Sequence, residues 1–270
     1  MTRIHTDRIG ESVPDRAGLL CRIGIVTLAF LAGCSKPPAS EQAAAAPKAP
    51  TINVDAATAG AITGVVSFKG VPPKVKSLDM SGDPGCPSGP QPADVVLVKD
   101  GKLANVFVYV KDGLPSGSFI SVAVVAPTTL DQKGCRYSPH MMGILAGVPL
   151  KITNTDTADH NIHDMPTKNP AFNESQMPTS KPITKTFATP EMMIPVQCNQ
   201  HPWMRAYINV MTHPYFAVSA ADGTFEIKNL PPGEYTLAAV HEKFGEQTIK
   251  IKVGPKETVK APFVYSAGAL

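Results

Sequence analysis

From residue 60 onward the sequence consists of short runs of β-forming residues separated by turn residues. No segment shows a sustained 3.6-residue periodicity of apolar side chains, and 27 Pro and 21 Gly favour many short strands over long helices. We predict an all-β protein of the sandwich type, because alternating strands need two packed faces. The expected strands are Ile62–Phe68, Val95–Val98, Asn105–Lys111, Ile120–Ala126, Leu150–Asn154, Lys185–Phe187, Met193–Cys198, Tyr207–Met211, Tyr215–Val218, Thr224–Ile227, Glu234–Ala239, Gln247–Val253 and Thr258–Pro262.

Residues 1–34 have the pattern of an export signal. Basic residues precede the apolar run Ile23–Ala32, which is too short for a comfortable membrane span. The run ends in Leu-Ala-Gly-Cys34, which resembles a bacterial lipobox and implies cleavage before Cys34 and lipidation of its sulfur. We expect a protein anchored in the cell envelope and facing the periplasm, with Ser35 favouring the outer membrane. Residues 35–58, rich in Ala and Pro, are expected to form a flexible tether.

The formal net charge of +3 gives no reason to expect a nucleic-acid partner. No nucleophile–base set or pair of carboxylates stands out in the sequence, so we do not predict an enzyme.

Three metal-binding side chains occur on one short segment: Cys198, His201 and Met204 stand at positions i, i+3 and i+6. A tight loop with this spacing can turn a thiolate, an imidazole and a thioether toward one point. Cys with two His and a weak axial Met is the ligand set of a blue-copper site. The second imidazole is available from His160, which follows the expected strand Leu150–Asn154 and a polar turn.

The cysteines support an oxidising compartment with one metal-bound thiol. Cys21 leaves with the signal, and Cys34 is the expected lipid site. Of the remaining three, Cys198 lies in the ligand-like loop, so we predict a disulfide between Cys86 and Cys135. The alternative is that Cys86 and Cys135 are further metal ligands alongside His140.

The pattern N-x-D-x-x-x-H-N at residues 154–161, followed by C-x-x-H-P-W-M at residues 198–204, resembles the cupredoxins, and among them the amicyanin type. The resemblance implies one mononuclear copper, cycling between Cu(I) and Cu(II), bound by His160, Cys198, His201 and Met204. It also implies that His201 is an exposed imidazole at the electron-exit face and that Asn161 joins the two ligand loops. Pro202 and Trp203 are expected to form a small docking patch for a redox partner, and His163 to lie outside the ligand set.

Other metal centres fit the composition less well. A binuclear copper site needs two Cys in the loop, and only Cys198 is present. A trinuclear oxidase centre needs several His-x-His pairs, and the sequence has none. Zinc accepts Cys and His, but thioethers such as Met204 suit copper better.

A second unit is indicated by Ala221–Leu237, in which D-G-T-F-E-I-K-N-L-P-P-G-E-Y-T-L resembles the carboxypeptidase-regulatory-like, or transthyretin-like, sandwich. The runs from Ile62 and from Leu103 resemble the start of such a domain. We expect residues 59–118 and 213–266 to form this sandwich, with a Greek-key cupredoxin domain at 119–212 inserted into it. The rival arrangement is two consecutive domains.

The whole chain resembles exported bacterial proteins described as methylamine-utilization or plastocyanin-like proteins. The leading hypothesis is a membrane-tethered carrier of single electrons, whose partner is a redox protein such as a cytochrome or a dehydrogenase. One alternative is copper storage or delivery, since soft thioethers hold Cu(I); its candidate residues are Met141, Met142, Met165, Met177, Met192 and Met193. Another is a non-redox binding sandwich with a degenerate copper site.

Overall fold

The computed structural model describes residues 51, 52, 54–116, 118, 119 and 129–268. Within these residues every regular element is a β-strand, which confirms the predicted all-β class. The expected signal, the lipidation site Cys34, residues 35–50 of the tether and the expected strand Ile120–Ala126 lie outside the described residues. No helix in the described part of the chain combines the length and the apolar character needed to cross a membrane.

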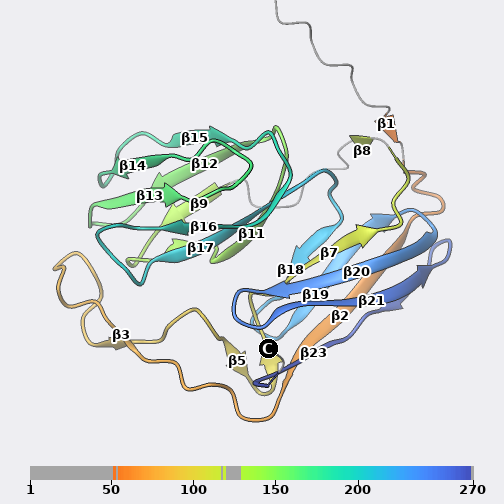
Figure 1. The fold of residues 1–270 in the computed structure, drawn as a ribbon, viewed down its shortest axis with the longest axis horizontal. Helices are drawn as coiled ribbons and strands as arrows, with labels where there is room; N and C mark the ends of the chain where they lie inside the picture. The colour runs from red at the N-terminus through yellow and green to blue at the C-terminus, as the bar shows by residue number, and fades with distance from the viewer. Residues whose placement is uncertain (1–50, 53, 117, 120–128, 269–270) are drawn as a thin grey trace, which may run out of the picture. The chain divides into compact units, whose positions relative to one another are not determined.

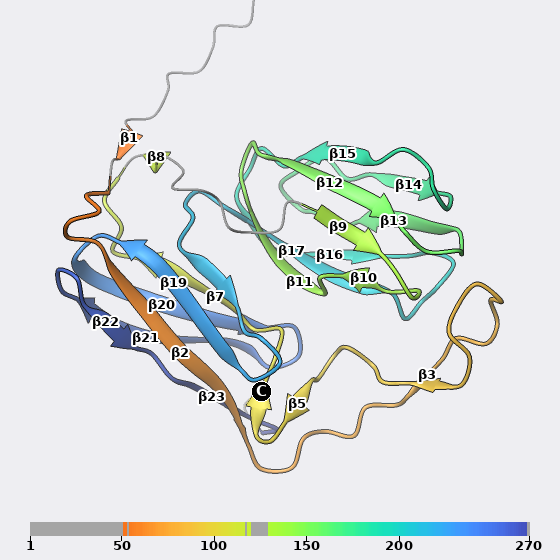
Figure 2. The ribbon, with the colours of Figure 1, turned by 180° about the vertical axis from the view of Figure 1, so that it is seen from behind.

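The strands between residues 129 and 211 form two sheets that we call the central sandwich (Figures 1 and 2). One sheet has the order β10-β9-β12-β15 and the other β11-β17-β16-β13-β14. The strands are β9 (Thr129–Gln132), β10 (Tyr137–Ser138), β11 (Met141–Leu145), β12 (Pro149–Asn154), β13 (His160–Asp164), β14 (Asn173–Gln176), β15 (Ile183–Thr186), β16 (Glu191–Gln197) and β17 (Arg205–Met211).

Strands that precede residues 129–211 in the sequence pair with strands that follow them, and together they form a second body, which we call the split sandwich. Its sheets have the orders β18-β7-β20-β21 and β19-β2-β6-β5, with β22 and β23 also paired to β2. The strands are β2 (Gly60–Lys69), β5 (Val98–Lys99), β6 (Lys102–Leu103), β7 (Phe107–Asp112), β18 (Phe216–Val218), β19 (Thr224–Leu230), β20 (Gly233–His241), β21 (Gly245–Val253), β22 (Thr258–Lys260) and β23 (Phe263–Ser266).

The turn at Asp222-Gly223 joins strands of different sheets in the split sandwich, β18 and β19. Gly223 has a φ of 76°, and a Cβ there would meet the carbonyl oxygen of Val66 at 2.4 Å. The side chain of Asp222 accepts a hydrogen bond from the backbone amide of Thr224 at 3.0 Å. The chain therefore needs glycine at residue 223, and the Asp222 side chain stabilises the turn before β19 by accepting a hydrogen bond.

Each sandwich has its own core, and a third cluster joins them. The core of the split sandwich includes Ile62, Val108 and Leu237. The core of the central sandwich includes Ile152, Cys198 and Ile208. The third cluster contains Phe107, Tyr109, Met141, Met211 and Ala238, which come from strands of both bodies.

A long excursion leaves β2 and returns at β5 (Figures 1 and 2). It contains the short strands β3 (Leu78–Asp79) and β4 (Pro90–Gln91), which pair antiparallel. Met80 and Cys86, within the excursion, are buried in the core of the central sandwich. A segment that starts and ends in the split sandwich is thus packed into the other body.

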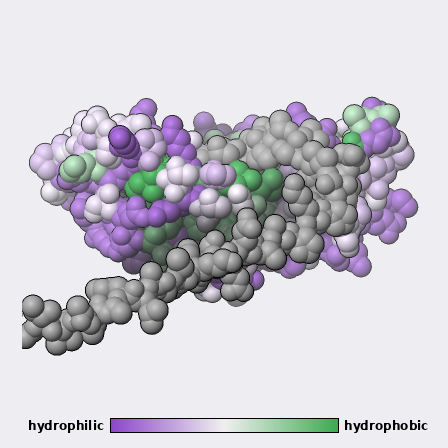
Figure 3. Space-filling view, turned by 90° about the horizontal axis from the view of Figure 1, so that it is seen from above, coloured by the Kyte–Doolittle hydropathy of each residue, from purple (hydrophilic) through white to green (hydrophobic). Residues whose placement is uncertain are grey.

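The face shown in Figure 3 is mainly hydrophilic, and strongly hydrophobic residues occupy small areas of it. Among the described residues the most exposed large apolar side chains are Val71, Met177 and Val264. Single exposed side chains of this kind are ordinary on protein surfaces.

Two further strands are short and adjoin undescribed residues in the sequence. β1 (Thr51–Ile52) pairs in parallel with β8 (Ser118–Phe119).

Candidate metal centre

His160 is placed by the turn that precedes it. Asn154, at the end of β12, donates hydrogen bonds from Nδ2 to the carbonyl oxygens of Ala158 (3.0 Å) and Gln176 (2.8 Å). Its Oδ1 accepts from the backbone amide of Asp156 at 2.9 Å. The buried Asn154 side chain therefore shapes the turn 155–159 and delivers His160 as the first residue of β13.

Asp156 holds the outer edge of the His160 ring. Its Oδ2 lies 3.0 Å from Nε2 of His160 and accepts the backbone amide of Cys135 at 2.6 Å. Burial would raise the pKa of this carboxyl group, but the hydrogen bonds from Cys135 and His160 outweigh burial and lower it. Because an ionised carboxylate accepts the proton on Nε2, Nδ1 of His160 faces inward and can offer its lone pair to a metal ion.

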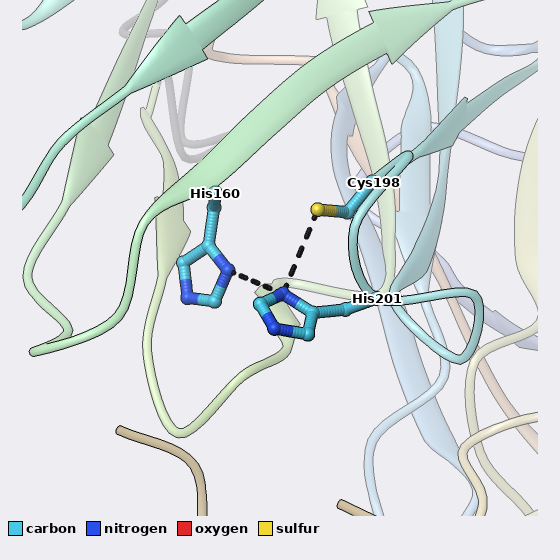
Figure 4. A group of neighbouring side chains, drawn as sticks. All are labelled: His160, Cys198 and His201. Carbon is cyan, nitrogen blue, oxygen red and sulfur yellow. Dashed lines mark hydrogen bonds between the residues drawn. The ribbon is translucent and has the colours of Figure 1, made fainter. Parts of the chain in front are cut away.

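Cys198 and His201 share the tight loop between β16 and β17. The backbone amide of Met204 donates to the carbonyl of His201 at 2.9 Å, and the amide of Cys198 to the carbonyl of Met204 at 3.3 Å. These two bonds close the loop on itself. As a result the side chains of Cys198 and His201 turn to the same side, toward His160 (Figure 4).

The donor atoms converge at the spacing that a small metal ion requires. Nδ1 of His160 and Nδ1 of His201 lie 3.0 Å apart, and Sγ of Cys198 lies 3.7 Å from Nδ1 of His201 (Figure 4). Tetrahedral binding at usual bond lengths separates two nitrogens by about 3.3 Å and a nitrogen from a sulfur by about 3.6 Å. All three residues are buried. This donor set fits a thiophilic transition metal.

The pKa values of Cys198 and His160 shift in opposite directions in the metal-free site. Burial would raise the pKa of the Cys198 thiol, but hydrogen bonds from His160 and from backbone amides lower it to about 6. Burial would likewise lower the pKa of His160, but its contacts with Cys198 and Asp156 raise it. A metal ion binds the thiolate and the unprotonated imidazole nitrogen, so metal binding at these residues would release protons.

Two other predicted site residues, Met204 and Asn161, lie in the surroundings of Cys198. Met204 is 1 % exposed and packs in the same hydrophobic cluster as Cys198, and its role as an axial ligand stays a prediction. The Asn161 side chain accepts a hydrogen bond from the backbone amide of Asn199, so it does join the His160 strand to the Cys198 loop.

His163 lies away from the donor cluster, with its Nδ1 3.0 Å from Oδ1 of Asn199.

The structure contains a disulfide between Cys86 and Cys135, which leaves Cys198 as the free cysteine among the described residues. His140 is not beside them: its Nδ1 contacts the carbonyl of Arg205 at 3.0 Å, and its Nε2 contacts Glu242. The alternative set of Cys86, Cys135 and His140 as joint metal ligands is therefore not formed.

The expectation of an exposed His201 imidazole is wrong, because the residue is only 3 % exposed. Its Nε2 lies 3.1 Å from Oδ2 of Asp83 and 3.8 Å from Sγ of Cys86. Pro202 is exposed, but Trp203 is partly buried and donates from Nε1 to the carbonyl of Cys135 at 3.0 Å. Pro202 and part of Trp203 are therefore accessible, and their role in docking stays a prediction.

Sequence reasoning missed both carboxylates of the site. Asp156 stands in the N-x-D-x-x-x-H-N pattern, four residues before His160, and that spacing is a usable signal. Asp83 begins the Asp-Pro-Gly-Cys turn that carries Cys86, 118 residues before His201. Only the alternative in which Cys86 and Cys135 are metal ligands placed this turn near the predicted metal site.

Comparisons with known proteins give limited matches. Residues 197–269 match the profile of a family described as ER membrane protein complex subunit 7, β-sandwich domain. This family differs from the predicted carboxypeptidase-regulatory-like one and agrees with it in the β-sandwich architecture. The match covers less than half of the chain. A comparison with curated protein sequences finds no match.

Several solved structures that are similar to part of the chain are copper proteins. They include a purple cupredoxin from Nitrosopumilus maritimus (21 % identity, TM-score 0.27, 31 % of this chain and 98 % of that one). A copper-containing nitrite reductase from Thermus scotoductus matches with 21 % identity and a TM-score of 0.29, over 32 % of this chain and 22 % of that one. A reduced amicyanin mutant matches with 20 % identity and a TM-score of 0.28, over 31 % and 80 %. These values are too low to support an inference about function.

Proposed function

We propose that the protein binds one copper ion and carries single electrons. The observation that carries this proposal is the convergence of Nδ1 of His160, Nδ1 of His201 and Sγ of Cys198 in a buried cluster. Copper held by a thiolate and two imidazoles exchanges one electron between Cu(II) and Cu(I).

The chain's own residues hold this cluster by contacts that do not depend on the metal. Asp156 fixes the ring of His160, and the backbone amide of Asn161 lies 3.5 Å from Sγ of Cys198. Because the donors are positioned by hydrogen bonds and burial, a change of charge at the centre requires little movement of the protein. Low reorganisation is what an electron carrier needs.

The test is to load the mature protein with Cu(II) and record its visible spectrum. An intense thiolate-to-copper band is expected in the wild-type protein and its loss in Cys198→Ala. His160→Ala should also weaken or remove the band, whereas His163→Ala, which removes a nearby imidazole outside the cluster, should retain it. A colourless wild-type protein would contradict the proposal, and loss of the band in His163→Ala would contradict the ligand assignment.

We further propose that the protein is anchored in the cell envelope through lipid on Cys34, faces the periplasm and exchanges electrons with a redox protein such as a cytochrome or a dehydrogenase. The Leu-Ala-Gly-Cys sequence supports the anchor. Metabolic labelling with a fatty-acid analogue should label the wild-type protein and Cys21→Ala, which changes a residue within the signal, and should not label Cys34→Ala. Absence of label in the wild-type protein, or label in Cys34→Ala, would contradict lipidation of Cys34.

Copper storage is the second candidate, because Met141 and Met211, with Met192 and Met193 beside them, lie in one hydrophobic cluster. Packing accounts for this cluster, since aromatic rings share it and Nδ2 of Asn209 donates to the sulfur of Met141 at 3.2 Å. The carrier predicts one Cu(I) per chain in a competition titration. Storage predicts several Cu(I) ions, with fewer in Met141→Leu/Met211→Leu.

A further inference from the structure

The imidazole of His201 is closed off from solvent although its loop is exposed. Asn199, Gln200 and Pro202 are exposed, whereas His201 is 3 % exposed. The residues on its Nε2 side are Asp83 and Cys86, which belong to the excursion between β2 and β5. We call Met80–Cys86 the capping segment.

Three contacts fix the capping segment against the central sandwich. Met80 is fully buried in the core of the central sandwich at one end. The disulfide to Cys135 holds Cys86 at the other end. Between them, the carbonyl of Gly85 accepts a hydrogen bond from Oγ1 of Thr157 at 3.2 Å, in the turn that precedes His160.

Asp83 is oriented within the capping segment before it meets His201. Its Oδ1 accepts the backbone amide of Gly85 at 2.7 Å, and its carbonyl accepts the amide of Cys86 at 3.0 Å. The second carboxylate oxygen, Oδ2, is then directed to Nε2 of His201. The two carboxylates of the site thus occupy equivalent places: Asp156 on the outer edge of His160 and Asp83 on the outer edge of His201.

We propose that Asp83 is a positioning residue for His201 and that the capping segment closes the His201 edge of the metal centre. A carboxylate that accepts the Nε2 proton fixes the ring, selects Nδ1 as the inward donor and makes that donor more basic. A partner that approaches this edge meets the exposed residues Ser81, Gly82 and Pro84 rather than the imidazole. The excursion between β2 and β5 thereby supplies part of the proposed metal site.

The closure is tested without metal by the exchange of the His201 Nε2 proton with water, followed by NMR of the metal-free protein. We expect slow exchange in the wild-type protein and exchange at least about tenfold faster in Asp83→Ala, which removes the acceptor. Asp79→Asn is the matched control, because Asp79 contacts Ser81 in the same excursion and not His201. A rapidly exchanging or unobservable wild-type proton would overturn the closure, as would equal exchange in Asp83→Ala.

A pair of glycines tests whether the capping segment must pack closely. A Cβ on Gly85 would lie 2.9 Å from Cβ and 3.1 Å from Cα of Ala158, whereas a Cβ on Gly82 would meet nothing within 4 Å. Gly85→Ala should therefore displace the segment and speed exchange at His201, and Gly82→Ala should not. Slow exchange in Gly85→Ala, or fast exchange in Gly82→Ala, would contradict close packing as the cause.

The positioning role is tested by the reduction potential, and this arm rests on the proposed copper function. A neutral amide at residue 83 makes the His201 imidazole less basic, which weakens the binding of Cu(II) more than that of Cu(I). Asp83→Asn should therefore raise the reduction potential. A tenfold change in the ratio of the two affinities corresponds to about 59 mV. Asp83→Glu, which keeps the carboxylate, should restore part of the shift, and Asp79→Asn should show none.

The outcomes separate the two proposals. A wild-type potential in Asp83→Asn, measured on protein that retains the thiolate-to-copper band, overturns positioning by Asp83 and leaves the carrier function intact. Absence of the band in wild-type protein overturns the carrier function, and the exchange measurements still decide whether Asp83 closes the His201 edge.

Discussion

The backbone amide of Asn161 donates a hydrogen bond to Sγ of Cys198 over 3.5 Å. The side chain of the same asparagine accepts the backbone amide of Asn199, the residue after the cysteine. One residue on β13 therefore supports both the sulfur and the loop that carries it. This connects the two ligand segments, which lie 38 residues apart in the sequence.

Removal of the Asn161 side chain should loosen the site without removing a ligand. Asn161→Ala leaves the amide of Asn199 without its acceptor, which we expect to cost about 1–3 kcal/mol of unfolding free energy. Copper should also dissociate faster, as measured by transfer of Cu(I) to a chelator. The control is Asn173→Ala, which removes the contact between Asn173 and Nδ2 of Asn161 and leaves the bond to Asn199. Equal behaviour of the two variants would argue against Asn161 as the link.

The disulfide between Cys86 and Cys135 should contribute strongly to stability, since it closes a loop with a sequence separation of 49. Loop-closure entropy predicts a loss of up to about 4 kcal/mol in Cys86→Ser/Cys135→Ser. Urea unfolding of the metal-free protein measures this loss. Wild-type protein reduced with dithiothreitol should unfold at the same urea concentration as the double variant. If the reduced wild type and the double variant unfold at the same urea concentration as the oxidised wild type, the disulfide does not contribute to the unfolding free energy.

A buried polar contact should couple the two sandwiches. His140, just before β11, contacts Glu242, just after β20, and both side chains are less than a tenth exposed. Hydrogen bonds to charged groups contribute about 1.5–3 kcal/mol, so Glu242→Ala should lower the unfolding free energy by that amount. A double-mutant cycle with His140→Ala isolates the pair. A coupling energy of zero would show that the contact adds nothing.

The predicted strands match the structure where apolar residues alternate with polar ones or form a continuous run. In β21 the described side chains alternate in exposure along Gly245–Val253, and the sequence prediction was Gln247–Val253. Of the strands of four or more residues, β9, β11, β13, β14 and β23 were missed, as were the two-residue strands other than β5. β14 reads Asn-Glu-Ser-Gln, and it is a strand because its backbone pairs with β13. Pairing of this kind leaves no periodic signal in the sequence.

In the candidate metal centre, too, the features with a local sequence signal were predicted and those set by contacts between distant segments were not. Cys198 and His201 were found because three residues of one loop determine their spacing, and His160 because its turn has a recognisable pattern. The burial of His201 was not found, because it depends on Asp83, which an excursion from the split sandwich brings to the ring. Local sequence predicted which side chains converge, but tertiary contacts decide which ring edges face solvent.

Glu191, the first residue of β16, organises the loop 167–169. Its carboxylate accepts hydrogen bonds from Oγ1 of Thr167 (2.9 Å), the amide of Lys168 (3.0 Å) and Nδ2 of Asn169 (2.9 Å), and also from the amide of Thr167. Burial would raise the pKa of Glu191, but these hydrogen bonds outweigh burial and lower the pKa to about 2. The folded protein thus prefers the ionised form.

This shift predicts a defined acid sensitivity. Because the pKa in the folded state lies below the unfolded value near 4.3, the contact stabilises fully above that pH and is lost as the pH falls toward about 2. The difference amounts to about 3 kcal/mol at neutral pH. Glu191→Gln should therefore be less stable at pH 6 and lose less stability between pH 5 and pH 2.5, measured by urea unfolding. Glu226→Gln, at an exposed carboxylate that contacts Lys228, is the control and should follow the wild-type pH profile. An unchanged profile in Glu191→Gln would remove Glu191 as the source of the acid sensitivity.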